Sequence, residues 1–169
     1  MNNNLNLIID IDGVMTDGGF YYDSKGKILK RFGAHDSDGI KLVKPFFNIM
    51  FISADMRGFL ISKKRILDMG FELYHVKEED RLSFVKKHGF ENCIFIADGH
   101  FDVEVLKKVK IGIATKNATD KAKKNANYIT KSIGGNGAVY EACIYLIKKL
   151  KLPVRWNIFH QLMIFLSAL

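Results

Sequence analysis

Short apolar runs alternate along this chain with stretches of helical spacing, and this alternation limits the folds open to it. The runs predict six strands, at 5–9, 48–53, 72–76, 93–97, 111–114 and 128–130. The stretches between and after them predict helices at 38–44, 58–69, 79–87, 101–107, 119–125 and 138–151. Strands that alternate with helices form βαβ units, which build a parallel sheet covered on both faces. We therefore expect an α/β protein with a three-layer, Rossmann-like fold.

The regular spacing of these elements indicates one domain. A chain of 169 residues is long enough for a single substantial core. Pro153 ends the last expected helix, so we expect one domain over 1–152 and an apolar C-terminal tail over 153–169. The apolar part of this tail is too short to span a bilayer. We favour its packing on the body or on a neighbouring subunit over contact with a membrane.

One segment, 19–32, departs from the alternation. Its strand-like residues flank a turn at 24–26, which predicts an inserted β-hairpin. A short hairpin cannot bury many large side chains by itself, and exposed aromatic residues in such number mark an interface. We therefore expect this flap to pack against another subunit through Phe20, Tyr21, Tyr22, Ile28 and Leu29.

Charge and cysteine content narrow the class of partner. The net charge of +8 suits an anionic partner. Its lysine pairs are spread over the expected helices without interleaved aromatic residues, so we expect a small anionic substrate and no nucleic acid. Cys93 and Cys143 lie in apolar surroundings and predict reduced core thiols. No basic or apolar leader precedes Asp10, so we expect a cytoplasmic protein.

Polar side chains stand at the ends of successive expected strands, with two candidate cations between them. The carboxyl ends of parallel strands meet along one edge of a sheet, where ligands bind. Phosphoryl transfer through an enzyme aspartate needs a carboxylate nucleophile, oxygen ligands for Mg²⁺, a hydroxyl and a fixed cation. Each residue alone could equally be a helix cap, a turn residue or a solvated charge, so the set carries the prediction. Its members are Asp10, Asp12, Ser53, Lys77, Arg81 and Asp98.

Two longer stretches carry a resemblance to a known family. The first reads Ile-Asp-Gly-Val-Met-Thr-Asp-Gly at 11–18, and the second reads Gly-Gly-x-Gly-Ala-x-x-Glu at 134–141. With the order of the strand-end residues, they resemble the capless branch of the haloacid dehalogenase superfamily of phosphatases. That branch includes phosphatases of 3-deoxy-D-manno-octulosonate (KDO) 8-phosphate and of nine-carbon sugar-acid (KDN or sialic acid) 9-phosphates. Weaker matches lie at 21–23, 30–32, 36 and 39–41.

The resemblance implies catalytic and metal-binding roles. Asp10 would be the nucleophile that forms an aspartyl-phosphate. Asp12 would be the general acid and base, and would also bind Mg²⁺ through its backbone carbonyl. Asp98 would complete the Mg²⁺ site, which Asp102 would support. Ser53 would hold the phosphoryl group.

The resemblance also implies substrate contacts and an assembly. Members of this branch form tetramers in which the flap and the glycine-rich segment of neighbouring subunits lie near the active site. We therefore expect a homo-oligomer, specifically a tetramer. The residues expected to contact the sugar-acid phosphate are Thr16, Asp55, Arg57, Gly134, Gly135 and Gly137.

Three positions depart from the family pattern. Arg81 stands where a lysine is usual, with Lys77 as the alternative cation. Gly99 stands where a second carboxylate is usual, which predicts a weaker metal site. Asp55 stands where octulosonate enzymes carry a cation and nine-carbon enzymes an acid, and so favours a nine-carbon substrate unless Arg57 supplies the cation. The departures at Arg81 and Gly99 keep one alternative open, a non-catalytic module for oligomer assembly. The net charge and the apolar tail keep open a second, a module that binds nucleic acid or membranes.

Overall fold

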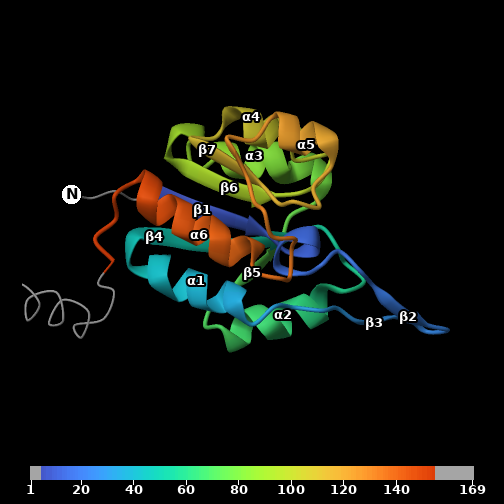
Figure 1. Cartoon of the computed structure of the whole chain (residues 1–169). Helices are drawn as coiled ribbons and strands as arrows, with labels where there is room; N and C mark the ends of the chain where they lie inside the picture. Colours follow the sequence, from blue (N-terminus) through green and yellow to red (C-terminus); the bar gives the residue numbers. More distant parts are fainter. Residues whose placement is uncertain (1–4, 155–169) are drawn as a thin grey trace, which may run out of the picture.

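A six-stranded parallel sheet organises the computed structural model, which describes residues 5–154 (Figure 1). Every strand pairing in this sheet is parallel. The strand order is β5-β4-β1-β6-β7-β8. The strands are β1 (Leu5–Asp10), β4 (Phe47–Ser53), β5 (Leu73–His75), β6 (Cys93–Ala97), β7 (Ile111–Ala114) and β8 (Tyr128–Ile129).

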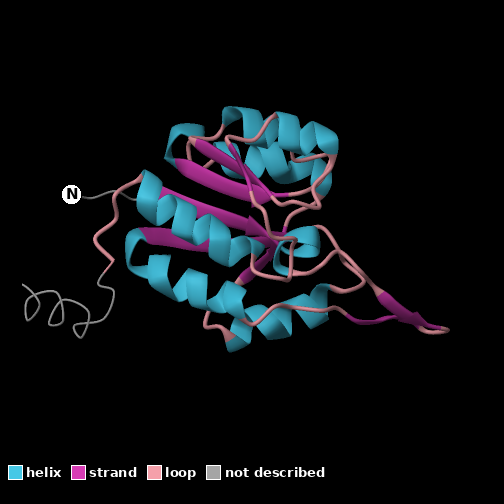
Figure 2. Ribbon diagram, in the orientation of Figure 1, coloured by secondary structure: helices cyan, strands magenta, loops and turns pink. Residues whose placement is uncertain are grey.

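Six helices cover the two faces of the sheet, so the expected three-layer α/β fold is confirmed (Figure 2). Side chains of α1, α2 and α6 join one hydrophobic cluster, and side chains of α3, α4 and α5 join the other. The bounds are α1 (His35–Val43), α2 (Phe59–Asp68), α3 (Arg81–Lys86), α4 (Val103–Lys108), α5 (Asp120–Lys124) and α6 (Ala138–Lys149).

The central strand β1 shows why the apolar runs form this sheet. Side chains alternate between the two faces of a strand. Leu7 and Ile9 accordingly lie in one cluster and Ile8 in the other, and all three are fully buried. Because both faces are covered by helices, the strand is continuously apolar from Leu7 to Ile9, directly before Asp10.

The order of the strands places a crevice beside Asp10. From β1 the chain continues to β4 and β5 on one side of the sheet, then crosses to β6, β7 and β8 on the other. The direction therefore reverses between β1 and β6. Open α/β sheets bind ligands outside the carboxyl ends of the strands at such a switch point.

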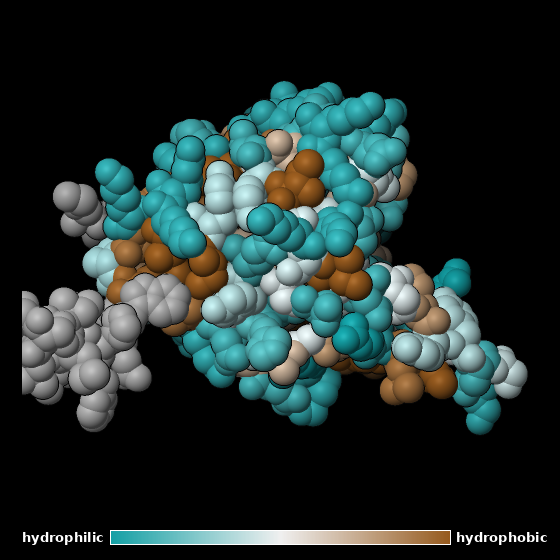
Figure 3. All heavy atoms as spheres, in the orientation of Figure 1, coloured by the Kyte–Doolittle hydropathy of each residue, from teal (hydrophilic) through white to brown (hydrophobic). Residues whose placement is uncertain are grey.

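The expected hairpin is present between β1 and α1, as strands β2 (Tyr21–Asp23) and β3 (Gly26–Leu29). It projects from the body of the molecule (Figure 1). A carboxylate oxygen of Asp23 accepts the backbone N–H groups of Lys25 and Gly26 and closes the turn. Hydrophobic atoms gather on this projection (Figure 3), where Phe20, Tyr21, Tyr22, Ile28 and Leu29 are all exposed. Its packing against another subunit stays a prediction.

The structure adjusts some expected boundaries. Helix α1 begins at His35, three residues before the expected start, and α3 begins at Arg81 after a short 3₁₀ turn over Glu78–Asp80. No cap domain is present within residues 5–154. Residues 155–169 of the expected tail lie outside the described part of the chain. Among the described helices, none combines the length and the apolar character needed to cross a bilayer.

Candidate active site

A tight turn over Ile11–Met15 follows β1 and shapes the floor of the site. Gly13 has a φ of +78°, in the left-handed region that favours glycine. The buried hydroxyl of Thr16 accepts the N–H groups of Gly13 and Gly18 at 3.2 and 3.3 Å. The Thr16 hydroxyl is thus used inside the turn, and its contact with substrate stays a prediction.

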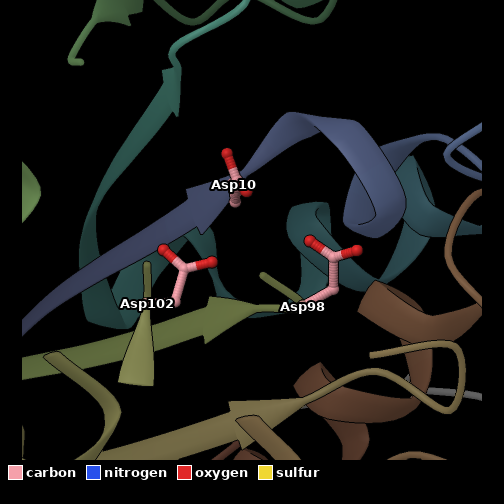
Figure 4. A group of neighbouring side chains, drawn as sticks. All are labelled: Asp10, Asp98 and Asp102. Atoms are coloured by element: carbon pink, nitrogen blue, oxygen red, sulfur yellow. The ribbon is translucent and has the colours of Figure 1, made fainter. Parts of the chain in front are cut away.

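Three carboxylates converge at the crevice between β1 and β6 (Figure 4). Asp10 ends β1, Asp98 follows β6, and Asp102 immediately precedes α4. One oxygen from each lies within 4.8 Å of the others. Asp102 is fully buried, and its carboxylate accepts the backbone N–H of Gly99 at 2.9 Å. Hard oxygen ligands at this spacing fit a Mg²⁺ ion.

The side chain of Asp98 packs directly against the turn. A Cβ atom built on Gly13 would lie 2.0 Å from Asp98 Oδ2. No real Cβ atom comes so close to an oxygen, so the absence of a side chain at 13 is what lets Asp98 reach the other carboxylates. Gly13 therefore allows both the backbone conformation of the turn and the close approach of Asp98.

The cation beside these carboxylates is Arg81 rather than Lys77. The Arg81 guanidinium donates to both oxygens of Asp10, at 3.1 and 3.2 Å, and Nη1 also donates to Asp102. This two-pronged contact is the geometry in which arginine pairs best with a carboxylate. Lys77 points away from the site, since its side chain is 64% exposed and its ammonium lies 3.9 Å from Glu79.

Burial and mutual repulsion raise the pKa values of two of the three carboxylates. Burial raises the pKa of Asp10 to about 8, an effect that Arg81 opposes and Asp102 reinforces. Burial and the Asp102 carboxylate raise the pKa of Asp98 to about 7. The cluster thus concentrates more negative charge than one guanidinium offsets. Such a site is prepared for a further cation.

Asp12 and Ser53 lie next to this cluster, in contact with each other. The Ser53 hydroxyl, at the end of β4, donates to Asp12 Oδ2 at 3.3 Å. The other oxygen of Asp12 forms an ion pair of 2.7 Å with the ammonium of Lys30, which lies just after β3. Lys30 was not expected at the site, although it belongs to the weak family match at 30–32.

A cavity of about 540 Å³ opens above the carboxylates. Asp55 lies in its wall, ion-paired with Lys27 and Lys30. Although partial burial acts to raise it, these two ammonium groups lower the pKa of Asp55 to about 2. The lining residues are Asp10, Asp12, Phe20, Tyr22, Lys27, Ala54, Asp55, Met56, Arg57, Glu78, Arg81, Asp98, Gly99, Phe101 and Asp102.

The glycine-rich segment supports the turn from behind and does not line this cavity. A Cβ atom on Gly134 would lie 2.1 Å from the carbonyl oxygen of Gly13, and the N–H of Gly135 donates to Val14. Gly137 precedes α6. Within one chain, the expectation that these glycines contact substrate is therefore not supported. Asn117, which sequence reasoning missed, donates to the Gly13 carbonyl at 2.9 Å.

Comparison with known proteins agrees with this geometry. A family model described as haloacid dehalogenase-like hydrolase matches residues 81–142. The KDO 8-phosphate phosphatase of Escherichia coli K12 is 30% identical over 147 residues, covering 83% of this chain and 78% of the relative.

Two solved structures of proteins with that name have similar folds. The one from Moraxella catarrhalis, in complex with a magnesium ion, a phosphate ion and KDO, aligns with a TM-score of 0.74 and 26% identity, over 86% of this chain and 87% of that one. The one from Yersinia pestis aligns with a TM-score of 0.75 and 26% identity, over 88% and 83%. This chain therefore belongs to the haloacid dehalogenase-like hydrolases.

Proposed function

We propose that this enzyme is a Mg²⁺-dependent phosphatase that hydrolyses KDO 8-phosphate through an aspartyl-phosphate. One observation carries the proposal: Asp10, Asp98 and Asp102 bring oxygen atoms within 4.8 Å of one another on the floor of an open cavity. The guanidinium of Arg81 lies across Asp10 at the same place. Relatives named as KDO 8-phosphate phosphatases support the choice of substrate.

The catalytic cycle would use two aspartates in turn. A carboxylate oxygen of Asp10 attacks phosphorus while the bond from phosphorus to the sugar oxygen breaks, and Asp12 gives a proton to that leaving oxygen. A water molecule then attacks the phosphorus of the aspartyl-phosphate and gives a proton to Asp12, while the bond from phosphorus to the Asp10 oxygen breaks. This frees phosphate and restores both carboxyl groups.

The remaining site residues would bind the metal and the phosphoryl group. Asp10, Asp98 and the Asp12 carbonyl would hold Mg²⁺, with Asp102 in support. The ion, when bound, would offset charge on the phosphoryl oxygens. Arg81 would present its N–H fork to those oxygens, and the Ser53 hydroxyl would donate to one of them. A magnesium ion is also present in the Moraxella catarrhalis structure named above.

The wall of the cavity supports the eight-carbon substrate over a nine-carbon one. Asp55 alone favoured a nine-carbon acid, but it is ion-paired with Lys27 and Lys30 and so presents no free negative charge. Arg57 lines the same wall and supplies a cation. Lys27 and Arg57, which both line the cavity, suit the carboxylate of a sugar acid.

We also infer that the active form is a homo-oligomer, with a tetramer as the specific expectation. The hairpin lines the cavity through Phe20, Tyr22 and Lys27. Its strands also carry exposed apolar side chains, which a partner subunit would cover. The alternative of a non-catalytic assembly module has less support, since every proposed catalytic group is present and lies beside the others.

Phosphate release from the purified chain tests the proposed function. We expect release from KDO 8-phosphate with Mg²⁺, little release in EDTA, and slower release from nine-carbon sugar-acid 9-phosphates. Asp10→Asn should abolish turnover, because an amide cannot accept the phosphoryl group. Asp68→Asn, which alters an aspartate at the exposed end of α2, is the matched control and should keep it. Release at the wild-type rate by Asp10→Asn would refute the proposal.

A further inference from the structure

The ammonium of Lys30 is buried where the hairpin meets the body of the protein. Its side chain has no exposed surface. The Nζ atom lies 2.7 Å from Asp12 Oδ1, 2.7 Å from Asp55 Oδ2 and 3.0 Å from the hydroxyl oxygen of Ser62. These oxygens come from three segments: the turn after β1, the loop after β4, and α2.

This environment fixes the position of the Lys30 ammonium. Removing a charge from water is costly unless partners replace the solvent. A lysine ammonium has three N–H donors and no acceptor. It donates a hydrogen bond to Ser62 and forms ion pairs with Asp12 and Asp55, so any displacement of the buried Lys30 ammonium would weaken these contacts. The long lysine side chain is therefore held in one conformation.

A fixed ammonium in turn restricts the carboxylate of Asp12. The terminal torsion of an aspartate is broad and allows the carboxyl group to turn. Here Lys30 holds Oδ1, and only a long hydrogen bond of 3.3 Å from Ser53 holds Oδ2. Because the ammonium is positively charged and has no acceptor, it disfavours a proton on Oδ1, the oxygen with which it is ion-paired. The other oxygen, Oδ2, is then the one able to carry and exchange a proton.

We propose that Lys30 is a positioning residue, which holds the Asp12 carboxyl group so that Oδ2 faces the leaving oxygen of the substrate. The proposal rests on the proposed function, because Asp12 must act as general acid and base. It assigns Lys30 no contact with substrate. It also links the hairpin to the chemistry, since Lys30 directly follows β3.

The first test compares a poor leaving group with a good one. A sugar alkoxide needs a proton as it leaves, whereas p-nitrophenolate does not. With enzyme in excess over substrate, the rate at which the leaving group is released in a single turnover reports the first step alone. Lys30→Met should slow that step on KDO 8-phosphate by about 100-fold, within the usual range for general acid catalysis. It should slow p-nitrophenolate release by less than about 3-fold. Equal slowing of both esters would overturn the proposal.

A double-mutant cycle tests whether Lys30 acts through Asp12. On KDO 8-phosphate, Lys30→Met should add little to the loss already caused by Asp12→Asn, because both remove the same function. Multiplying losses would contradict the proposal. The matched control is Lys25→Met, which removes an exposed lysine from the turn of the same hairpin. This variant should hydrolyse both esters at the rates of the wild type.

Ser62→Ala provides a second test if Lys30→Met does not fold. This change removes one partner of Lys30 and keeps its charge. We expect a smaller decrease than for Lys30→Met, again confined to KDO 8-phosphate. A decrease of equal size on both esters would count against the proposal. If the wild-type enzyme hydrolyses neither ester, the proposed function itself fails. If the wild-type enzyme is active but the effect of the variants does not depend on the leaving group, only the positioning role of Lys30 fails.

Discussion

Replacing Gly13 with alanine should separate the stability of this fold from its activity. Gly13 and Gly70 have almost the same backbone φ, +78° and +77°. Alanine in the left-handed region costs about 1–2 kcal/mol. Both Gly13→Ala and Gly70→Ala should therefore lose that much unfolding free energy. In a chain of this size, each 1 kcal/mol corresponds to a decrease in Tm of about 2–4 °C.

The two variants differ in what the new methyl group meets. A Cβ at 70 has no atom within 4 Å, whereas a Cβ at 13 would lie 2.0 Å from Asp98 Oδ2. Cγ of Asp98 would also lie only 2.5 Å away, so the whole carboxyl group must move. To reach even 3.0 Å it must shift by about 1 Å. A misplacement of that size in a catalytic site can reduce the rate by about 100-fold.

We therefore expect Gly13→Ala to lose about 100-fold in kcat and to bind Mg²⁺ more weakly, while Gly70→Ala keeps the activity of the wild type. Urea unfolding gives the two stabilities, and phosphate release titrated with Mg²⁺ gives the two activities. The reasoning is refuted if Gly13→Ala retains both wild-type turnover and wild-type Mg²⁺ dependence. It is refuted equally if Gly70→Ala loses activity to the same extent.

Three further predictions follow from the charges and the hairpin. Arg81→Met should lower the unfolding free energy measured in urea by about 3–5 kcal/mol, because it leaves Asp10 and Asp102 buried without their cation. Without divalent cations, the unfolding free energy measured in urea should fall as pH rises from about 4 to about 8. The pKa of Asp10 is raised in the folded state, so the folded state binds more protons than the unfolded state in this range. Asp10→Asn should lack this contribution. Polar substitution of Tyr21 and Leu29 should give a smaller species in sedimentation. It should slow hydrolysis of KDO 8-phosphate more than hydrolysis of p-nitrophenyl phosphate. A monomer with full activity on KDO 8-phosphate would contradict this expectation.

The sequence predicted those site residues whose placement follows from topology alone. Asp10, Ser53 and Asp98 stand at or directly after strand ends, so a parallel sheet brings them to one edge whatever the loops do. The apolar runs located those ends to within a residue or so. The same argument placed the hairpin beside the site, because it is inserted directly after the aspartates.

Residues placed by loop geometry could not be assigned in this way. Lys77 and Arg81 both precede or begin the same helix, and the 3₁₀ turn over Glu78–Asp80 separates them, leaving Lys77 in solvent and Arg81 over Asp10. The Thr16 hydroxyl can form hydrogen bonds with either substrate or backbone N–H groups, and the geometry of the tight turn brings it to the backbone. Lys30 lies on the hairpin, and the fold of the hairpin against α2 brings it to Asp12.

The charges in the cavity imply an order of binding. Among the described residues that line it, six are acidic and three are basic, although the whole chain carries a net charge of +8. The basic surface attracts an anionic substrate from a distance, but solvent ions screen that attraction beyond about 8 Å. Inside the cavity a phosphate group would meet a surplus of carboxylates until a divalent cation offsets them. We therefore expect Mg²⁺ to bind before the substrate. Calorimetry should show inorganic phosphate binding at least about 10-fold more weakly in EDTA than in Mg²⁺, a difference of about 1.4 kcal/mol, and equal affinity in the two buffers would contradict this order.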